Sequence, residues 1–185
     1  MPSNSSIVQL GWKAKNFSLP STSGNNASYN EIKGKNGILV AFICNHCPYV
    51  VDILPRMIFD FKKLKALEVG VVAIMSNDSK QYPEDSFENM KIFANKNNFF
   101  FNYLYDESQD VAASYKAVCT PDFFCFDKND SLFYRGRLDN IKYRQQNQET
   151  RISELLNAYI KLIENNEIMD RQISSMGCSI KWKKT

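Results

Sequence analysis

The sequence has no apolar run near the ~20 residues of a membrane-spanning helix, so no membrane partner is expected. Its first residues lack the charged start and apolar core of a secretory signal peptide. Taking Met1 as the natural start, we expect a cytoplasmic protein. The charge is almost balanced, with 23 Lys and Arg residues against 20 Asp and Glu residues. Such a mild excess, without a concentrated basic stripe, predicts no nucleic-acid partner.

Histidine is nearly absent, and His46 is the only one. The five cysteines are an odd number and are not spaced like a secreted disulfide scaffold. In a reducing compartment, a close cysteine pair is more often catalytic or metal-binding than structural. A closed zinc site needs four ligands, whereas Cys44, His46 and Cys47 supply three. We therefore expect no metal and no cofactor, and a metal-binding chaperone that uses these three residues is the less favoured alternative.

A chain of 185 residues fits one domain, residues 1–185, with an N-terminal extension at 1–16 and a C-terminal tail at 167–185. Continuous apolar runs at 38–43 and 69–75 predict buried strands. The runs DFFCFD and SLFYRGRL, joined by KND, predict an antiparallel hairpin. Apolar spacing and a capping serine predict helices after Cys44 and at 87–97, 108–117 and 151–166. Because strands alternate with helices before the hairpin, we expect an α/β fold in which helices flank a central mixed sheet.

The segment AFICNHCPYVVDI carries Cys44 and Cys47 two residues apart, with His46 between them. We place Cys44 where the strand gives way to a helix, whose first turn offers unpaired N–H groups and a partial positive charge. Both effects, and a nearby His46, should lower the pKa of Cys44. Cys47, one turn further in and less exposed, could then attack a mixed disulfide formed on Cys44. The pattern favours thiol–disulfide exchange by these three residues over two inert buried thiols.

Three segments, ILVAFICNHCPYV, VCTPDFFCFD and LFYRGRLDN, together resemble the thioredoxin-like redoxins of the alkyl hydroperoxide reductase/thiol-specific antioxidant (AhpC/TSA) superfamily. The resemblance runs from about Phe17 to Ile163 and implies a thioredoxin-like fold and a thiol–disulfide oxidoreductase. It implies protein or small-molecule disulfides as substrates, and a thiol such as thioredoxin or glutathione as reductant. It also implies that Thr120 and a cis Pro121 lie against the active-site disulfide and help to bind the substrate.

The sequence departs from the family pattern at four positions. Ile43 stands where thioredoxin has Trp, and Ile38 stands where thioredoxin has a buried Asp that accepts a proton, so the proton acceptor is left open. Peroxiredoxins carry Pro-x-x-x-Thr-x-x-Cys, but here Gly37 and Ala41 occupy the Pro and Thr positions. A thiol-dependent peroxidase is therefore the alternative function rather than the expected one.

The other cysteines have different expected roles. Cys119 lies two residues before Pro121, and Cys178 lies in the tail segment SSMGCSIKWK, which resembles a bacterial subgroup of these redoxins. Either could be an auxiliary redox thiol or an ordinary cysteine. Cys125 alternates with phenylalanines in a strand pattern, which predicts a core position.

Two arginines, Arg135 and Arg137, should share one strand face in YRGRLD. We expect them to be solvated residues of an edge strand rather than a site that steers an anionic partner.

Overall fold

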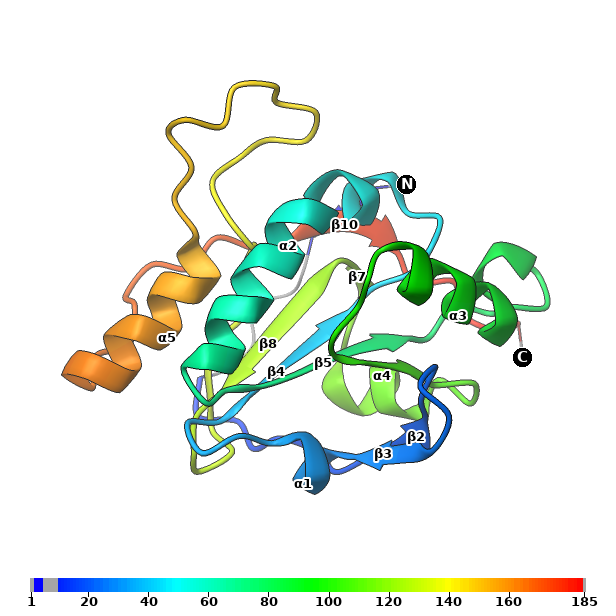
Figure 1. The fold of residues 1–185 in the computed structure, drawn as a ribbon, viewed down its shortest axis with the longest axis horizontal. Helices are drawn as coiled ribbons and strands as arrows, with labels where there is room; N and C mark the ends of the chain where they lie inside the picture. Colours follow the sequence, from blue (N-terminus) through cyan, green and yellow to red (C-terminus); the bar gives the residue numbers. More distant parts are fainter. Residues whose placement is uncertain (1, 5–9, 185) are drawn as a thin grey trace.

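A five-stranded mixed sheet forms the centre of the computed structural model, which describes residues 2–4 and 10–184 (Figure 1). The spatial order is β6 (Asn102–Tyr105), β5 (Gly70–Met75), β4 (Ile38–Phe42), β8 (Asp122–Phe126) and β9 (Leu132–Tyr134). β4 and β5 are parallel, as are β5 and β6, whereas β8 runs antiparallel to both β4 and β9. The two buried strands and the hairpin are thus where the sequence predicts them.

Helices cover both faces of this sheet. One face packs against α2 (Pro48–Ala66), α3 (Phe87–Lys96) and α5 (Glu154–Asn165), and the other against the short helices α1 (Tyr29–Ile32) and α4 (Asp110–Tyr115). Successive strand side chains point to opposite faces, so Leu39 and Ala41 enter one core while Ile38, Val40 and Phe42 enter the other. The mixed α/β fold expected from the sequence is confirmed.

Two small sheets complete the fold. β2 (Ser18–Pro20) pairs with β3 (Asn26–Ser28), and β10 (Met176–Ser179) lies between β1 (Pro2–Asn4) and β7 (Cys119–Thr120). The segments expected as an extension and a tail therefore contribute paired strands, although their boundaries remain predictions. No helix within residues 2–4 and 10–184 is long and apolar enough to cross a membrane.

The two arginines expected to be solvated are in fact paired, and that expectation was wrong. Arg135 is buried and forms an ion pair of 2.7 Å with the fully buried Asp122. Arg137 forms a bidentate pair with Glu154, at 2.8 and 2.6 Å. The partners come from the start of β8 and from α5, so the pairing depends on tertiary contacts that a local strand pattern does not reveal.

Candidate active site

The two cysteines of the CxxC segment lie just before α2. β4 ends at Phe42, and the helix begins at Pro48 with Cys47 as its N-cap residue. The backbone of Cys47 is extended (φ −69°, ψ 120°), as expected of a residue that precedes proline. Proline itself is well suited to the first helical position, because its missing N–H would have no intrahelical partner there.

This geometry corrects the predicted placement of the cysteines. The helix starts at Pro48, and so Cys44 lies three residues before the N-cap instead of within the first turn. Cys47, which was expected deeper in the helix, is the N-cap residue itself and so lies nearest the partial positive charge of the helix terminus. Cys44 and Cys47 are almost completely buried, with 1% and 0% of their surfaces exposed.

Both sulfur atoms contact Thr120, which lies two residues before the start of β8. The Cys47 sulfur lies 3.0 Å from the carbonyl oxygen of Thr120, to which it donates a hydrogen bond when it is protonated, and the Cys44 sulfur lies 3.3 Å from the Thr120 hydroxyl. The Thr120–Pro121 peptide bond is cis, which confirms the conformation implied by the family resemblance. The fold therefore brings all four predicted residues together, while the role of Thr120 and Pro121 in substrate binding remains a prediction.

The two thiols also interact with each other and titrate as a pair. The hydrogen bond from Cys44 lowers the pKa of Cys47 to about 5, helped by the side chain of Cys178 and the N–H of Val50. The same hydrogen bond, burial and the carboxylate of Asp85 raise the pKa of Cys44. The predicted fall in the pKa of Cys44 is therefore wrong in this reduced state, because the helix terminus faces the other sulfur. The pair holds one proton and one negative charge over a wide pH range.

A buried carboxylate, Asp85, lies beside the pair, although it is not among the residues predicted from the sequence. It ends the 3₁₀ helix η1 (Pro83–Asp85) and has no exposed surface. Its two oxygens accept hydrogen bonds from the backbone N–H of Asn45 (2.8 Å) and the side chain of Asn77 (2.7 Å). A signal did exist: the polar loop SNDSKQYPEDS follows β5, which is parallel to β4 and ends at the same edge of the sheet.

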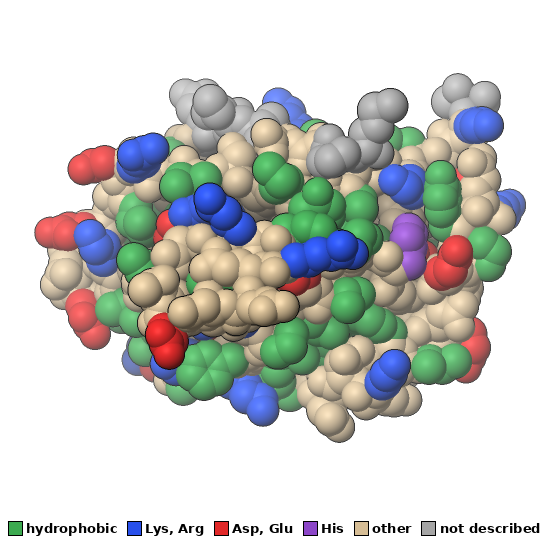
Figure 2. Space-filling model, turned by 90° about the horizontal axis from the view of Figure 1, so that it is seen from above, with side chains coloured by type: hydrophobic (Ala, Val, Ile, Leu, Met, Phe, Trp, Pro, Cys, Tyr) green, Lys and Arg blue, Asp and Glu red, His purple; other side chains and the backbone are tan. Residues whose placement is uncertain are grey.

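The imidazole of His46 forms an ion pair with Asp85. The distance from Nδ1 to the carboxylate oxygen is 2.8 Å, but the angles are not those of a hydrogen bond, so the contact acts mainly through charge. Asp85 raises the pKa of His46. The ring stacks on Tyr82 with its centroid at 5.8 Å and reaches the surface (Figure 2, purple). The His46 ring thus lies between the buried carboxylate of Asp85 and the solvent (Figure 2).

Three donor atoms here could hold a metal ion. The sulfur of Cys44, a ring nitrogen of His46 and a carboxylate oxygen of Asp85 all lie within 4.8 Å of one another. Thiolate, imidazole and carboxylate are all zinc ligands. This set differs from the expected one, because Asp85 takes the place of Cys47.

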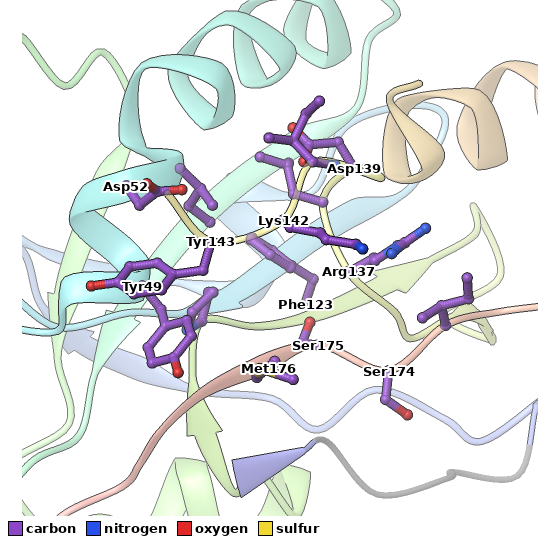
Figure 3. Close-up of a pocket in the computed structure, with 15 residues that line it drawn as sticks. Tyr49, Asp52, Phe123, Arg137, Asp139, Lys142, Tyr143, Ser174, Ser175 and Met176 are labelled. Atoms are coloured by element: carbon purple, nitrogen blue, oxygen red, sulfur yellow. The ribbon is translucent and has the colours of Figure 1, made fainter. Parts of the chain in front are cut away.

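A cavity of about 500 Å³ lies among α2, the start of β8 and the residues that lead into β10 (Figure 3). Neither Cys44 nor Cys47 lines it, but two lining residues are close to the site in sequence: Pro121 follows Thr120, and Tyr49 lies two residues after Cys47. The rings of Tyr49 and Tyr143 stack with their centroids 4.5 Å apart. Arg137 and Lys142 add cationic groups to a lining that is mostly apolar. The wall between β9 and α5 is anchored by ion pairs of Asp139 with Arg56 (2.8 Å) and Arg151 (2.7 Å).

The remaining cysteines occupy three different environments. Cys125 is fully buried in the sheet, which confirms the expected core position. Cys119 is buried too, its thiol donates to the carbonyl oxygen of Pro121 (3.4 Å), and burial raises its pKa. Cys178 in β10 is partly exposed, packs against the core that contains Cys44 and Cys47, and helps to lower the pKa of Cys47. The fold therefore brings Cys178 to the pair from more than a hundred residues away.

Comparisons with known proteins place this geometry in context. The model of the AhpC/TSA family matches residues 10–135. An uncharacterized conserved protein from Geobacillus kaustophilus is 38% identical with a TM-score of 0.94, over 100% of this chain and 98% of that chain. A hypothetical protein from Sinorhizobium meliloti 1021 is 34% identical with a TM-score of 0.91, over 98% and 99% of the two chains.

A more distant structural match concerns the fold alone. The thioredoxin domain of a thiol-disulfide oxidoreductase from Bacteroides vulgatus is 19% identical with a TM-score of 0.65, over 85% of this chain and 100% of that domain. The fold is thus thioredoxin-like. A search of curated proteins finds no match.

Proposed function

The chain belongs to the AhpC/TSA family, and on that premise we propose that it is a thiol–disulfide oxidoreductase whose dithiol/disulfide couple is Cys44 and Cys47. The observation that carries the proposal is the placement of two buried sulfurs just before α2, both touching Thr120 and each shifting the pKa of the other. Two inert core thiols would need neither a shared proton nor a carboxylate–imidazole pair beside them.

The reaction begins with the single negative charge that the pair holds. When the shared proton moves onto the Cys47 sulfur, Cys44 becomes the thiolate and attacks one sulfur of a substrate disulfide. The substrate S–S bond breaks, a mixed disulfide forms on Cys44, and the departing thiolate takes up a proton. Cys47 then loses its proton, attacks the Cys44 sulfur and expels the second substrate thiol. Two electrons pass from the pair to the substrate, and an external thiol reductant such as thioredoxin or glutathione restores the pair.

Neighbouring groups support each charge that develops. The Thr120 hydroxyl is placed to donate a hydrogen bond to the Cys44 thiolate at 3.3 Å. The His46 imidazolium, held by Asp85, can supply the proton that the departing thiolate needs. The buried carboxylate of this site is thus Asp85, which follows β5, whereas the β4 position that carries a buried Asp in thioredoxin is Ile38 in this chain.

Substrate would enter along the cis Pro121 and the adjoining cavity. Both sulfurs are buried, so a disulfide must reach them between Thr120–Pro121 and the start of α2. The stacked rings of Tyr49 and Tyr143 and the mostly apolar lining suit a protein side chain or the organic part of a small-molecule disulfide.

A second candidate function is the binding of a thiophilic divalent cation such as Zn²⁺, favoured by the donor triplet of Cys44, His46 and Asp85. Elemental analysis of the purified protein tests it, because a stoichiometric metal that disappears in His46→Ala would support the cation site. Consumption of hydrogen peroxide in the presence of a thioredoxin donor tests the peroxidase alternative in the same preparation.

The deciding experiment is reduction of insulin disulfides by dithiothreitol with and without the protein. We expect catalysis by the wild type, none by Cys44→Ser, and unchanged catalysis by the control Cys125→Ala, which removes a core thiol away from the pair. The Cys47→Ser variant should instead accumulate a mixed disulfide on Cys44, detectable by mass spectrometry. Equal activity of Cys44→Ser and the wild type would refute the proposal.

A further inference from the structure

The C-terminal strand β10 is fixed against the cysteine pair. In its antiparallel pairing with β7, Cys178 lies opposite Thr120, whose carbonyl oxygen accepts the hydrogen bond from Cys47. The approach is so close that a Cβ atom on Gly177 would lie 2.0 Å from that same oxygen, so glycine is required there. The position of Cys178 near the pair therefore follows from strand register and is not a chance contact of a loose tail.

Cys178 faces the pair and also reaches solvent. Its side chain packs on the core that contains Cys44 and Cys47, and it is close enough to Cys47 for each thiol to shift the pKa of the other. Of the five cysteines it is the only one that is not buried. The three cysteines thus share one part of the core, and Cys178 is the most accessible of them.

Burial keeps Cys178 in its thiol form in the reduced protein. Burial and the contact with Cys47 raise the pKa of Cys178 to about 11, while Lys181 acts in the opposite direction. The reactivity of Cys178 toward the pair therefore depends on its position: the register of β10 holds it opposite Thr120, the residue that the sulfurs of Cys44 and Cys47 both contact.

We propose that Cys178 is a third redox residue that takes over the disulfide from the buried pair. Its thiolate attacks the Cys47 sulfur of the Cys44–Cys47 disulfide, the bond between those two cysteines breaks, and a Cys47–Cys178 disulfide forms. Cys44 leaves as a thiolate and takes the proton that Cys178 has lost. The step neither gains nor loses electrons, and it moves the disulfide from a buried position to one that an external thiol reductant can reach.

This inference rests on the proposed function, and disulfide mapping tests the two separately. The wild type and the Cys44→Ser variant are oxidised with an equimolar amount of diamide, free thiols are blocked in acid, and linked peptides are identified without reduction. We expect Cys44–Cys47 and Cys47–Cys178 links in the wild type, and only the Cys47–Cys178 link in Cys44→Ser. The control Cys119→Ala should give the wild-type pattern, because Cys119 has its own partner in the carbonyl oxygen of Pro121.

Kinetics of the Cys178→Ser variant provide the second readout. Reduction of a disulfide substrate in a single turnover should match the wild type, whereas re-reduction of the oxidised protein by glutathione should slow by about tenfold or more, since access to the disulfide is lost. If Cys178 stays fully alkylated after oxidation and its replacement changes neither rate, the inference is wrong while the proposed function stands. If the wild type forms no Cys44–Cys47 link and reduces no disulfide, the proposed function itself fails.

Discussion

Replacing Cys44 with alanine should abolish the acidity of Cys47. With a pKa of about 5, Cys47 is about 99% ionised at pH 7, whereas a free thiol with a pKa near 8.5 is about 3% ionised. The structure therefore predicts roughly 30 times more thiolate at neutral pH than an isolated cysteine would give. The largest cause is the hydrogen bond from Cys44, so Cys44→Ala should move the ionisation of Cys47 back toward the ordinary thiol range.

The assay is the ultraviolet absorbance of the thiolate, measured as the difference between reduced and oxidised protein from acid to alkaline pH. The wild type should show a thiolate that appears near pH 5, and Cys44→Ala should lose that step. Cys119→Ala is the matched control: it also removes a buried thiol near the pair, but one whose pKa is raised by burial and which adds no thiolate in this range. If Cys44→Ala retains the acidic step, the hydrogen bond between the two thiols is not its cause.

The same ionisation predicts a pH dependence of stability with a definite sign. Because the folded state lowers the pKa of Cys47, its thiolate stabilises the fold at a pH above the ordinary thiol pKa of about 8.5. That contribution shrinks as the pH falls and is lost below about 5. The difference in unfolding free energy between the reduced wild type and Cys47→Ser, measured with denaturant, should therefore narrow from pH 8 to pH 5. A difference that is constant over this range would contradict the assignment.

Three further predictions concern the surroundings of the pair. In Asp85→Asn the pKa of His46 should fall, and a proton NMR titration of this single histidine measures the change directly. Because the wild-type pKa is raised, the ion pair stabilises the fold below about pH 6.5, and this stabilisation is lost as the pH rises through the pKa of the folded state. The redox potential of the couple should lie above the thioredoxin value of about −270 mV, because a stabilised thiolate favours the reduced form; a lower value measured against glutathione would refute this. Arg135→Met leaves Asp122 charged and buried without its partner, so denaturant unfolding should show a loss of about 3–5 kcal/mol, whereas the double variant with Asp122→Leu should recover part of it.

The architecture was predictable because its signals are local. The apolar run at 38–43 is too short for a helix and fully buried, and it became the central strand β4. The run that ends in Cys125 and Phe126 became β8, paired with β4 and β9. Period and length suffice for such elements, since a buried strand needs little more than a continuous run of β-forming residues.

The site was predicted only in part, because its geometry depends on one local rule and several distant contacts. The residue before a proline avoids the helical conformation, so Cys47 is expected to lie outside the helix and Pro48 to begin it. This rule places the helix terminus next to Cys47, which makes Cys47 rather than Cys44 the favoured thiolate. Asp85 and Cys178 could not be assigned in the same way. They reach the pair through the parallel register of β5 and the antiparallel register of β10, which single-sequence patterns do not specify.

The sheet topology also explains how a buried carboxylate can serve this site from a new position. β4 and β5 are parallel, so the segments that follow them meet at one edge, and β8 begins at that edge because Phe42 pairs with Asp122. Three separate segments therefore converge on the cysteines: the CxxC turn, the loop after β5 and the residues before β8. Because Asp85 comes from the loop after β5, the position in β4 can be the apolar Ile38, which packs in the core. The same convergence leaves room for β10 to add a third sulfur beside Thr120, so the redox chemistry can change by substitution at the edge while the strands keep their packing.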